Sequence, residues 1–214
     1  MSLAERLDHI RAGAEKRISA EARAVMHAAV TAVKDSGVMA SIISTGAQLP
    51  AFSLPGGTGH PVSSHALLVQ GPLVISFYRG HWCPYCNAEL DALQKVLGGI
   101  RSLGASLVAI CPQTPERNAA TQQKLRLEFS VLSDHANAYA RSLRLVHELP
   151  DDLRDVYRGF GVDLPESNGE DSWTLPFPTR IVVDRTGLIR DVQSDPDYTR
   201  RSEPADTVEI LRSL

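Results

Sequence analysis

Cysteine is scarce in this chain, with three residues among 214. An odd number leaves at least one thiol unpaired, which argues against a secreted scaffold held together by disulfides. No apolar run approaches the roughly 18 residues that span a bilayer. The first residues, MSLAERLDHIRAGAEKR, mix charged and apolar side chains and so lack the continuous apolar core of a signal peptide. These absences predict a cytoplasmic protein with reduced thiols.

A strong charge of either sign is also missing. The net charge is −3, which gives no electrostatic reason to expect nucleic acid or an anionic membrane as a partner. The short basic cluster TRR at 199–201 is interpreted as solvated surface. Hydrophobic residues make up 43% of the chain, so a single domain can bury a sizeable core.

The N-terminal segment carries apolar side chains at helical spacing. Residues 2–36 are predicted to form one long amphipathic helix that ends at the Ser-Gly pair at 36–37. We assign residues 1–45 to an N-terminal helical extension and residues 46–214 to the main domain. The extension either packs back on its own domain or forms the arm of a homodimer.

The main domain alternates between predicted strands and helices. After a turn-rich stretch at 46–64, the apolar run PLVISFY at 72–78 is short and continuous, as in a buried central strand. The alternation, closed by a hairpin and a last helix with Ser202 as its N-cap, predicts an α/β sandwich with a mixed sheet. The other predicted strands are 105–110, 129–134, 180–184 and 188–192, the predicted helices are 84–103, 115–127, 136–144, 149–159 and 203–214, and a polar loop is predicted at 163–172.

Two of the three cysteines stand in the stretch WCPYC, where the buried strand passes into a helix. The first turn of a helix has unsatisfied N–H groups and about half a positive charge, both of which favour a thiolate. A cysteine placed there can become a nucleophile at neutral pH. Because only Pro84 and Tyr85 separate Cys83 from Cys86, the sulfurs come within bonding reach. The spacing predicts a dithiol that closes to a disulfide and reopens.

Other interpretations of the cysteine pair require further residues near it. A structural zinc site uses this spacing but needs four ligands, and only Cys111 and scattered histidines such as His81 remain to complete it. Attachment of haem requires a histidine directly after the second cysteine, where Asn87 stands. A redox dithiol without metal or cofactor is therefore the preferred interpretation, with a zinc site and an inert pair as alternatives.

A second signal lies about ninety residues downstream, in LPFPTRIVVD. Pro178 directly precedes a predicted strand. A cis peptide at such a junction would hold the backbone close to a facing sulfur and leave a groove for an extended partner. Alone, Pro178 is an ordinary proline at a strand start. Together with the cysteine pair it indicates a function.

These stretches resemble a known family. From about Gly46 to the C-terminus, GAQLPAFSLP, VISFYRGHWCPYCNAEL, FSVLSD and PTRIVVDRTGLIRDV are similar to peroxiredoxin-like proteins of the AhpC/TSA type, in the thioredoxin-fold superfamily. The resemblance implies a thioredoxin-like α/β fold, with a mixed central sheet flanked by helices. It also implies thiol-dependent peroxide reduction, with thioredoxin or glutathione as the reductant.

The resemblance gives two different assignments of the attacking sulfur. Against peroxiredoxins, Cys86 matches the peroxide-attacking cysteine and Glu89 a family glutamate. Cys83 then replaces a hydroxyl residue and Pro178 an arginine, both of which bind peroxide in that family. Against thioredoxins, which have the WCxxC motif and a cis-proline, Cys83 is the attacking residue.

The position of the pair on the helix favours the second assignment. Cys83, at the edge of the helix, is expected to be the more exposed sulfur, and Cys86 the sheltered one that resolves a mixed disulfide. Arg79 either supplies part of the missing positive charge or is solvated. Trp82 is expected to shield one side of the pair.

Two residues outside the motif have open roles. Trp173 either lines the same groove as the cysteine pair or belongs to the core. Cys111 is expected to be a buried hydrophobe rather than a third redox thiol.

The sequence thus predicts a thiol oxidoreductase that cycles Cys83 and Cys86 between dithiol and disulfide. Peroxide reduction is the first choice. A thioredoxin-type disulfide reductase is the alternative, and a redox-responsive or zinc-holding interaction module is a third.

Overall fold

The computed structural model describes residues 1–57 and 59–214, so Thr58, inside the predicted turn-rich stretch, lies outside it. The central sheet of the described chain has five strands in the order β5-β4-β3-β8-β9. Its middle strand is parallel to β4 and antiparallel to β8, so the predicted mixed sheet is confirmed. The bounds of these strands are β3 (Leu73–Phe77), β4 (Ser106–Cys111), β5 (Ser130–Ser133), β8 (Thr179–Val183) and β9 (Ile189–Ser194).

Helices cover both faces of the sheet, which is why every residue of β3 is buried. On one face, α4 (Pro84–Ser102) and α9 (Pro204–Arg212) pack beside each other over β3 and β4. On the other face, α3 (Ser64–Gln70) and α6 (Ala138–Ser142) pack with the segment around Phe52. Each face therefore has its own apolar core, as a two-layer cover on a central sheet requires.

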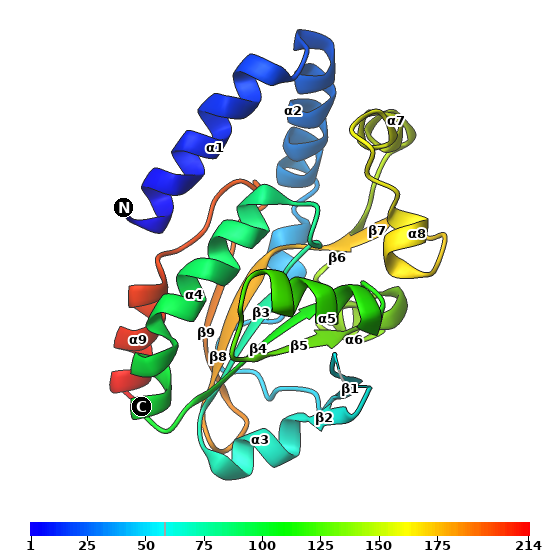
Figure 1. The fold of residues 1–214 in the computed structure, drawn as a ribbon. Coiled ribbons are helices and arrows are strands. Elements are labelled where there is room, and N and C mark those ends of the chain that lie inside the picture. Colours follow the sequence, from blue (N-terminus) through cyan, green and yellow to red (C-terminus); the bar gives the residue numbers. More distant parts are fainter. Residues whose placement is uncertain (58) are drawn as a thin grey trace.

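The single long helix predicted for residues 2–36 is wrong. The structure has two helices, α1 (Leu3–Arg17) and α2 (Ala20–Asp35), which stand as a pair at one end of the sheet (Figure 1). Ile18 is extended, and the Ser19 side chain accepts a bond from the Ala22 N–H and so begins a new helix. Serine is a strong N-cap, which local apolar spacing alone does not reveal.

The first of these helices is anchored to the core of the domain. Leu3 and Leu7 are almost fully buried beside α4 and α9. The Glu203 carboxylate accepts bonds from the Leu3 and Ala4 N–H groups, at 3.2 and 2.8 Å. This charge at the start of α1 also suits the helix dipole. Of the two options for the extension, α1 therefore packs on its own chain. The division of the chain at residue 45 stays a prediction.

The remaining elements are short, and several were not predicted. The polar loop expected at 163–172 contains a helix, because Asp163 caps it by accepting from the Glu166 N–H. The last helix has Glu203, not Ser202, as its N-cap. The unpredicted elements are η1 (Val38–Ser41), α3, β6 (Val146–Glu148), β7 (Thr174–Pro176) and α8 (Leu164–Asn168), and the others are β1 (Ser53–Pro55), β2 (Pro61–Ser63), α5 (Pro115–Lys124), η2 (His135–Asn137) and α7 (Asp151–Gly159).

None of the helices in the described part of the chain is both long and apolar enough to cross a membrane.

The anchoring of α1 can be tested by truncating Leu7. We expect Leu7→Ala to lower the free energy of unfolding by about 2–4 kcal/mol, because it leaves a cavity in the core. Urea denaturation measures this change. Val69→Ala is the control: its side chain is 71% exposed, and its effect should stay below about 0.5 kcal/mol. Equal midpoints for Leu7→Ala and wild type would show that α1 contributes nothing to the core.

Candidate active site

The loop between β3 and α4 has a fixed course that depends on a glycine. Gly80 has a φ of +148°, and a Cβ there would lie 2.5 Å from Trp82 Nε1 and 2.9 Å from Gln113 Oε1. The Gln113 side chain, which follows β4, accepts a 2.5 Å bond from the His81 N–H. The Cys83 N–H in turn donates to the Gly80 carbonyl at 3.1 Å. These bonds set Cys83 at the N-cap of α4.

Both sulfurs of the pair are buried. Cys83 is 1% exposed and Cys86 is fully buried, so Cys83 is the more exposed sulfur, as expected, although it is far more buried than its position at the edge of the helix suggests. The covering comes from aromatic rings and from the N-terminal helices, which the sequence does not place there. Cys83 nevertheless lines a cavity of about 230 Å³, together with Trp82 and Tyr85. Trp82 therefore lies in the same cavity wall as Cys83, and its shielding role stays a prediction.

Arg79 is the positive group nearest to Cys83. Its Nη1 lies 3.9 Å from the Cys83 Sγ. The guanidinium lies over the ring of Tyr198, 4.0 Å from the centroid, and also over Trp82 and Tyr157. Arg79 also donates to the Tyr157 hydroxyl, and among the described residues its Nε has no hydrogen-bond partner. With 3% exposure, Arg79 is not solvated, so that alternative is wrong.

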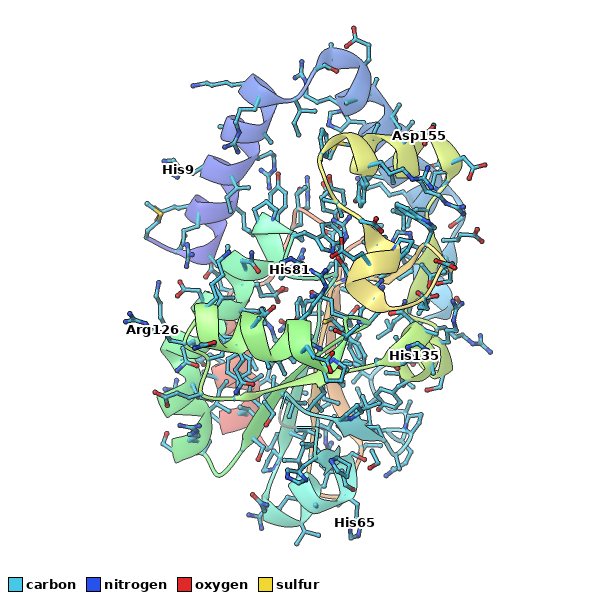
Figure 2. All side chains as sticks on the ribbon, turned by 45° about the vertical axis from the view of Figure 1, so that its right-hand side comes forward. His9, His65, His81, Arg126, His135 and Asp155 are labelled. Atoms are coloured by element: carbon cyan, nitrogen blue, oxygen red, sulfur yellow. The ribbon has the colours of Figure 1, made fainter. Side chains whose placement is uncertain are left out.

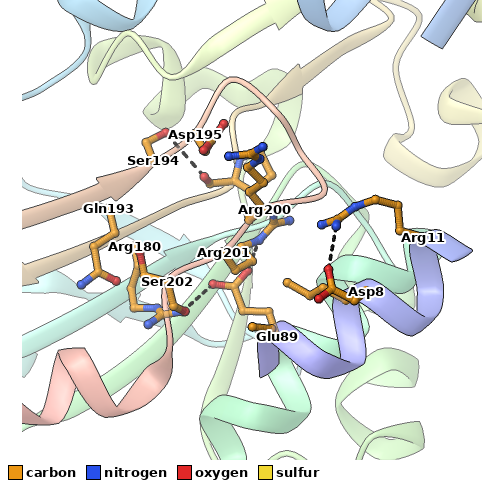
Figure 3. Close-up of a pocket in the computed structure, with 13 residues that line it drawn as sticks. Asp8, Arg11, Glu89, Arg180, Gln193, Ser194, Asp195, Arg200, Arg201 and Ser202 are labelled. Carbon is orange, nitrogen blue, oxygen red and sulfur yellow. Dashed lines mark hydrogen bonds and ion pairs between the residues drawn. The ribbon is translucent and has the colours of Figure 1, made fainter. Parts of the chain in front are cut away.

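A second positive group, Arg201, approaches Cys86 from the segment after β9. Its Nη2 lies 3.5 Å from the Cys86 Sγ and its Nε 2.5 Å from Glu89 Oε2. The other Glu89 oxygen pairs with Arg180 at 2.9 Å, so this buried carboxylate holds two guanidinium groups, as Figure 3 shows. The interpretation of residues 199–201 as solvated surface is thus wrong for Arg201, whose side chain is 3% exposed.

These charges separate the acidities of the two thiols. Burial raises the pKa of Cys83, but the hydrogen bond from Cys86 and the charges of Arg79 and Arg201 outweigh it and lower the pKa to about 6. Burial raises the pKa of Cys86 well above its usual value, and the hydrogen bond and negative charge of Cys83 raise it further. At neutral pH the pair is therefore a Cys83 thiolate beside a Cys86 thiol.

Glu89 remains ionised in this setting. Burial raises its pKa, but the two arginines outweigh the burial and lower it. One feature of the sequence points to the ion pairs of Glu89 with the two arginines. Glu89 lies on the buried stripe of α4, between Cys86 and Leu93. A buried carboxylate requires cationic partners. Which arginines supply them depends on contacts more than ninety residues apart in the chain.

Pro178 differs from its expected role. No peptide bond of the described chain is cis, so the expected cis-proline is wrong. The preceding Phe177 donates its N–H to the Leu145 carbonyl at 2.6 Å and stacks on His147, which fixes the chain here by contacts away from the cysteines. Pro178 is buried and lines two neighbouring cavities, but it is not among the described residues that line the Cys83 cavity.

Cys111 and Trp173 are both buried in the protein core. Burial raises the pKa of Cys111 to about 12, and its thiol donates to Asn118 Oδ1 at 3.0 Å. It is a buried thiol, as expected. Trp173 is buried in the cluster around α7 and stacks under Arg158, so it belongs to the core rather than to the groove.

The histidines are dispersed. Those labelled in Figure 2 come from α1, α3, the loop before α4 and η2. Within residues 1–57 and 59–214, no group of three or more His, Cys, Asp or Glu side chains could hold a metal ion. The described residues therefore provide no ligand set for the zinc alternative.

The chain is similar to the AhpC/TSA family and to peroxiredoxin Q proteins of plants. The model of the AhpC/TSA family matches residues 45–192. The chloroplastic peroxiredoxin Q of Sedum lineare is 26% identical over 172 residues, which is 80% of each chain. That of Populus jackii is 25% identical over 172 residues, 80% of this chain and 70% of the relative.

Solved structures share the fold. Peroxidoxin BcpB from Mycobacterium tuberculosis superposes with a TM-score of 0.62 at 23% identity, covering 80% of this chain and 98% of the other. Peroxiredoxin 6 of Arenicola marina, as a cysteine-to-serine mutant, gives a TM-score of 0.65 at 14% identity, covering 80% and 73%. The predicted thioredoxin-like fold is confirmed.

The role of Arg79 can be tested through the acidity of Cys83. In the wild-type protein, alkylation by iodoacetamide should follow a thiolate that forms as the pH rises through about 6. We expect Arg79→Met to move this midpoint to higher pH, because the thiolate loses an attractive charge. The pH dependence of the alkylation rate measures the shift.

Arg185→Met is the control for this measurement, since that exposed side chain bonds the Gln70 carbonyl away from the cysteines. Its midpoint should equal that of the wild type. An unchanged midpoint in Arg79→Met would show that Arg79 does not stabilise the thiolate.

Proposed function

The chain belongs to the AhpC/TSA family, and on this premise we propose that it is a thiol peroxidase in which Cys83 attacks the peroxide and Cys86 resolves the product. The observation that carries the assignment of roles is the difference between the two sulfurs. Cys83 lies 3.9 Å from Arg79 and lines a cavity, whereas Cys86 is fully buried behind it. Only the first sulfur is both ionised and within reach of a small substrate.

The first step transfers one oxygen atom. The Cys83 thiolate attacks the terminal oxygen of the hydroperoxide, so that an S–O bond forms and the O–O bond breaks. The leaving alkoxide takes up a proton and departs as an alcohol, or as water when the substrate is hydrogen peroxide. Arg79 faces the sulfur and stabilises the negative charge that passes from sulfur to the leaving oxygen.

The second step follows from the loss of charge at Cys83. The pKa of Cys86 is raised by burial and, in addition, by the hydrogen bond and negative charge of Cys83. A neutral sulfenic acid at Cys83 removes that charge, while Arg201 still lies 3.5 Å from the Cys86 Sγ. The pKa of Cys86 therefore falls once Cys83 has been oxidised to the sulfenic acid. Its sulfur displaces the sulfenic hydroxyl as water, and an S–S bond closes within the first turn of α4.

The cycle requires an external reductant. We assign this role to a thioredoxin-type dithiol or to glutathione, which returns two electrons by thiol–disulfide exchange. Such a reductant and three free thiols fit a reducing compartment, and we place the protein in the cytoplasm. A homodimer is compatible with the half-buried apolar stripe of α2, which has no fully buried residue.

Stopped-flow oxidation of the reduced protein by hydrogen peroxide, followed by tryptophan fluorescence, tests these roles. We expect Cys83→Ser to lower the rate constant at pH 7 by at least about tenfold, because the remaining sulfur, Cys86, is fully buried and is not among the described residues that line the cavity at Cys83. Cys86→Ser should still react rapidly but should stop at a sulfenic acid, detected as a dimedone adduct by mass spectrometry.

The reverse pattern would contradict the assignment. If oxidation stays fast in Cys83→Ser and is lost in Cys86→Ser, then Cys86 attacks the peroxide. If the wild type reacts no faster than free cysteine but reduces a protein disulfide rapidly, the protein is a disulfide reductase.

A further inference from the structure

Gln113 holds the loop that carries Cys83 through both polar atoms of its side-chain amide. This side chain follows β4 and is fully buried. Its Oε1 accepts the His81 N–H at 2.5 Å, and its Nε2 lies 2.9 Å from Nδ1 of the same histidine. Gly80 permits this approach, because a Cβ there would lie 2.9 Å from the Gln113 Oε1. The two bonds are here called the Gln113–His81 clamp.

The clamp fixes the protonation state of the His81 ring. A backbone N–H can only donate, so the amide oxygen of Gln113 faces it and the amide nitrogen faces Nδ1. The amide nitrogen is itself a donor, and Nδ1 must therefore be an acceptor without a proton. His81 in the clamp is thus the neutral tautomer with its proton on Nε2. A protonated ring would turn an N–H at Nδ1 towards the N–H groups of Gln113.

The surroundings of His81 also favour the neutral ring. Burial lowers its pKa, and the positive charges of Arg117 and Lys124 on α5 lower it further, against the opposing charge of Glu166 on α8. The ring is half-buried and lines a cavity of about 110 Å³ together with both of these cations. Because its pKa lies below the ordinary value of about 6.5, His81 is neutral at pH 7 and takes up a proton only at lower pH.

His81 stands between the two groups whose separation sets the charge at the reactive sulfur. Arg79 precedes it by two residues and Cys83 follows it by two, and the Arg79 Nη1 lies 3.9 Å from the Cys83 Sγ. The His81 carbonyl accepts a 2.7 Å bond from Asn87 Nδ2, which ties the same residue to α4. The N–H, the carbonyl and the ring of His81 are therefore all held from outside the loop. A shift of His81 would move the sulfur relative to its cation.

From this geometry we propose that Gln113 and His81 are positioning residues for the Cys83 thiolate, and that a proton on His81 Nδ1 opens the clamp. This inference rests on the proposed function, since it assigns the residues that hold the attacking sulfur in place. With the clamp closed, the loop keeps Cys83 beside Arg79. With the proton in place, two donors oppose each other and the bond to Nδ1 is lost. The site then loses its alignment in acid, in addition to any protonation of the sulfur itself.

Nitrogen NMR of the histidine rings tests the closed clamp directly, with His81→Asn to assign the signal. In the reduced wild-type protein at pH 7, we expect His81 to carry its proton on Nε2 and to leave Nδ1 unprotonated. The ring should become protonated only below about pH 6.5. A proton on Nδ1 at pH 7 would overturn the proposal, because Gln113 could not then make both bonds.

Variants at His81 separate the hydrogen bond of the ring from its charge. Asparagine offers an acceptor near the place of Nδ1 but takes up no proton, whereas leucine offers no acceptor. We expect His81→Leu to raise the midpoint of Cys83 ionisation, followed by absorbance at 240 nm, and to lower the rate constant with hydrogen peroxide at pH 7 at least about fivefold. His81→Asn should restore most of both. Gln113→Leu should act as His81→Leu does, and the half-buried His81 keeps the test valid even if this buried substitution prevents folding.

The pH dependence distinguishes positioning from a merely structural role. The rate constant with hydrogen peroxide is divided by the thiolate fraction at each pH, which removes the ionisation of Cys83. From pH 7 to about pH 4.5, this quotient should fall at least about fivefold in the wild type and stay constant in His81→Asn. The control is His65→Leu, since His65 is exposed on α3, far from His81 (Figure 2), and should follow the wild type. Circular dichroism at each pH checks that the protein is folded.

The outcomes separate this inference from the proposed function. A quotient that falls equally in the wild type and His81→Asn, or in neither, would overturn the inference and leave the peroxidase assignment intact. If hydrogen peroxide oxidises every form no faster than free cysteine, the proposed function fails. A midpoint of Cys83 ionisation that rises in His81→Leu and returns in His81→Asn would still support the positioning of the thiolate, because that measurement needs no peroxide.

Discussion

The central constraint in this structure is an excess of buried positive charge at the start of α4. Arg79 and Arg180 are 3% and 2% exposed, and the side chain of Arg201 is 3% exposed. Glu89 pairs only with Arg180 and Arg201. Leaving a cation in a protein interior without an anion is costly. The Cys83 thiolate, 3.9 Å from Arg79, supplies that anion. Burial opposes this charge, but the hydrogen bond from Cys86, and after it the charges of Arg79 and Arg201, lower the pKa of Cys83 so that this sulfur can carry the anion.

Much of the surrounding fold serves to hold these charges in place. Strand β3 ends at the loop that carries Arg79, and Gly80 gives that loop its turn. The segment after β9 brings Tyr198 over Arg79 and Arg201 to Cys86. A few residues later, the Glu203 carboxylate accepts hydrogen bonds from the N–H groups of Leu3 and Ala4, at the start of α1. The same short segment thus links the dithiol to the N-terminal helices that cover it.

The sequence predicted those parts of the site that depend on local order. The apolar run at 72–78 and the WCPYC stretch placed the cysteines at a strand-to-helix junction, because burial and helix capping act over a few residues. The break at Ile18 was missed, since the spacing of apolar residues continues through it and only the cap at Ser19 interrupts the helix. The family resemblance indicated a lost arginine at Pro178.

The burial of Arg201 beside Glu89 could not be predicted for a different reason. Its contact with Glu89 joins residues 112 positions apart, and nothing in the TRR cluster distinguishes a buried arginine from a solvated one. The near-complete burial of Cys83 could not be predicted for the same reason, because its cover includes residues of α1 and α2 and Tyr157. Contacts of this kind follow from tertiary packing and not from any local pattern.

The most direct test of the account is a thiolate titration by absorbance at 240 nm on the reduced wild type, Cys83→Ser and Cys86→Ser. We expect one thiolate that forms near pH 6 in the wild type. It should persist in Cys86→Ser, where a hydroxyl still donates to the sulfur, and be absent from Cys83→Ser. A low-pH thiolate that remains in Cys83→Ser and disappears in Cys86→Ser would place the buried anion on the other sulfur and contradict the account.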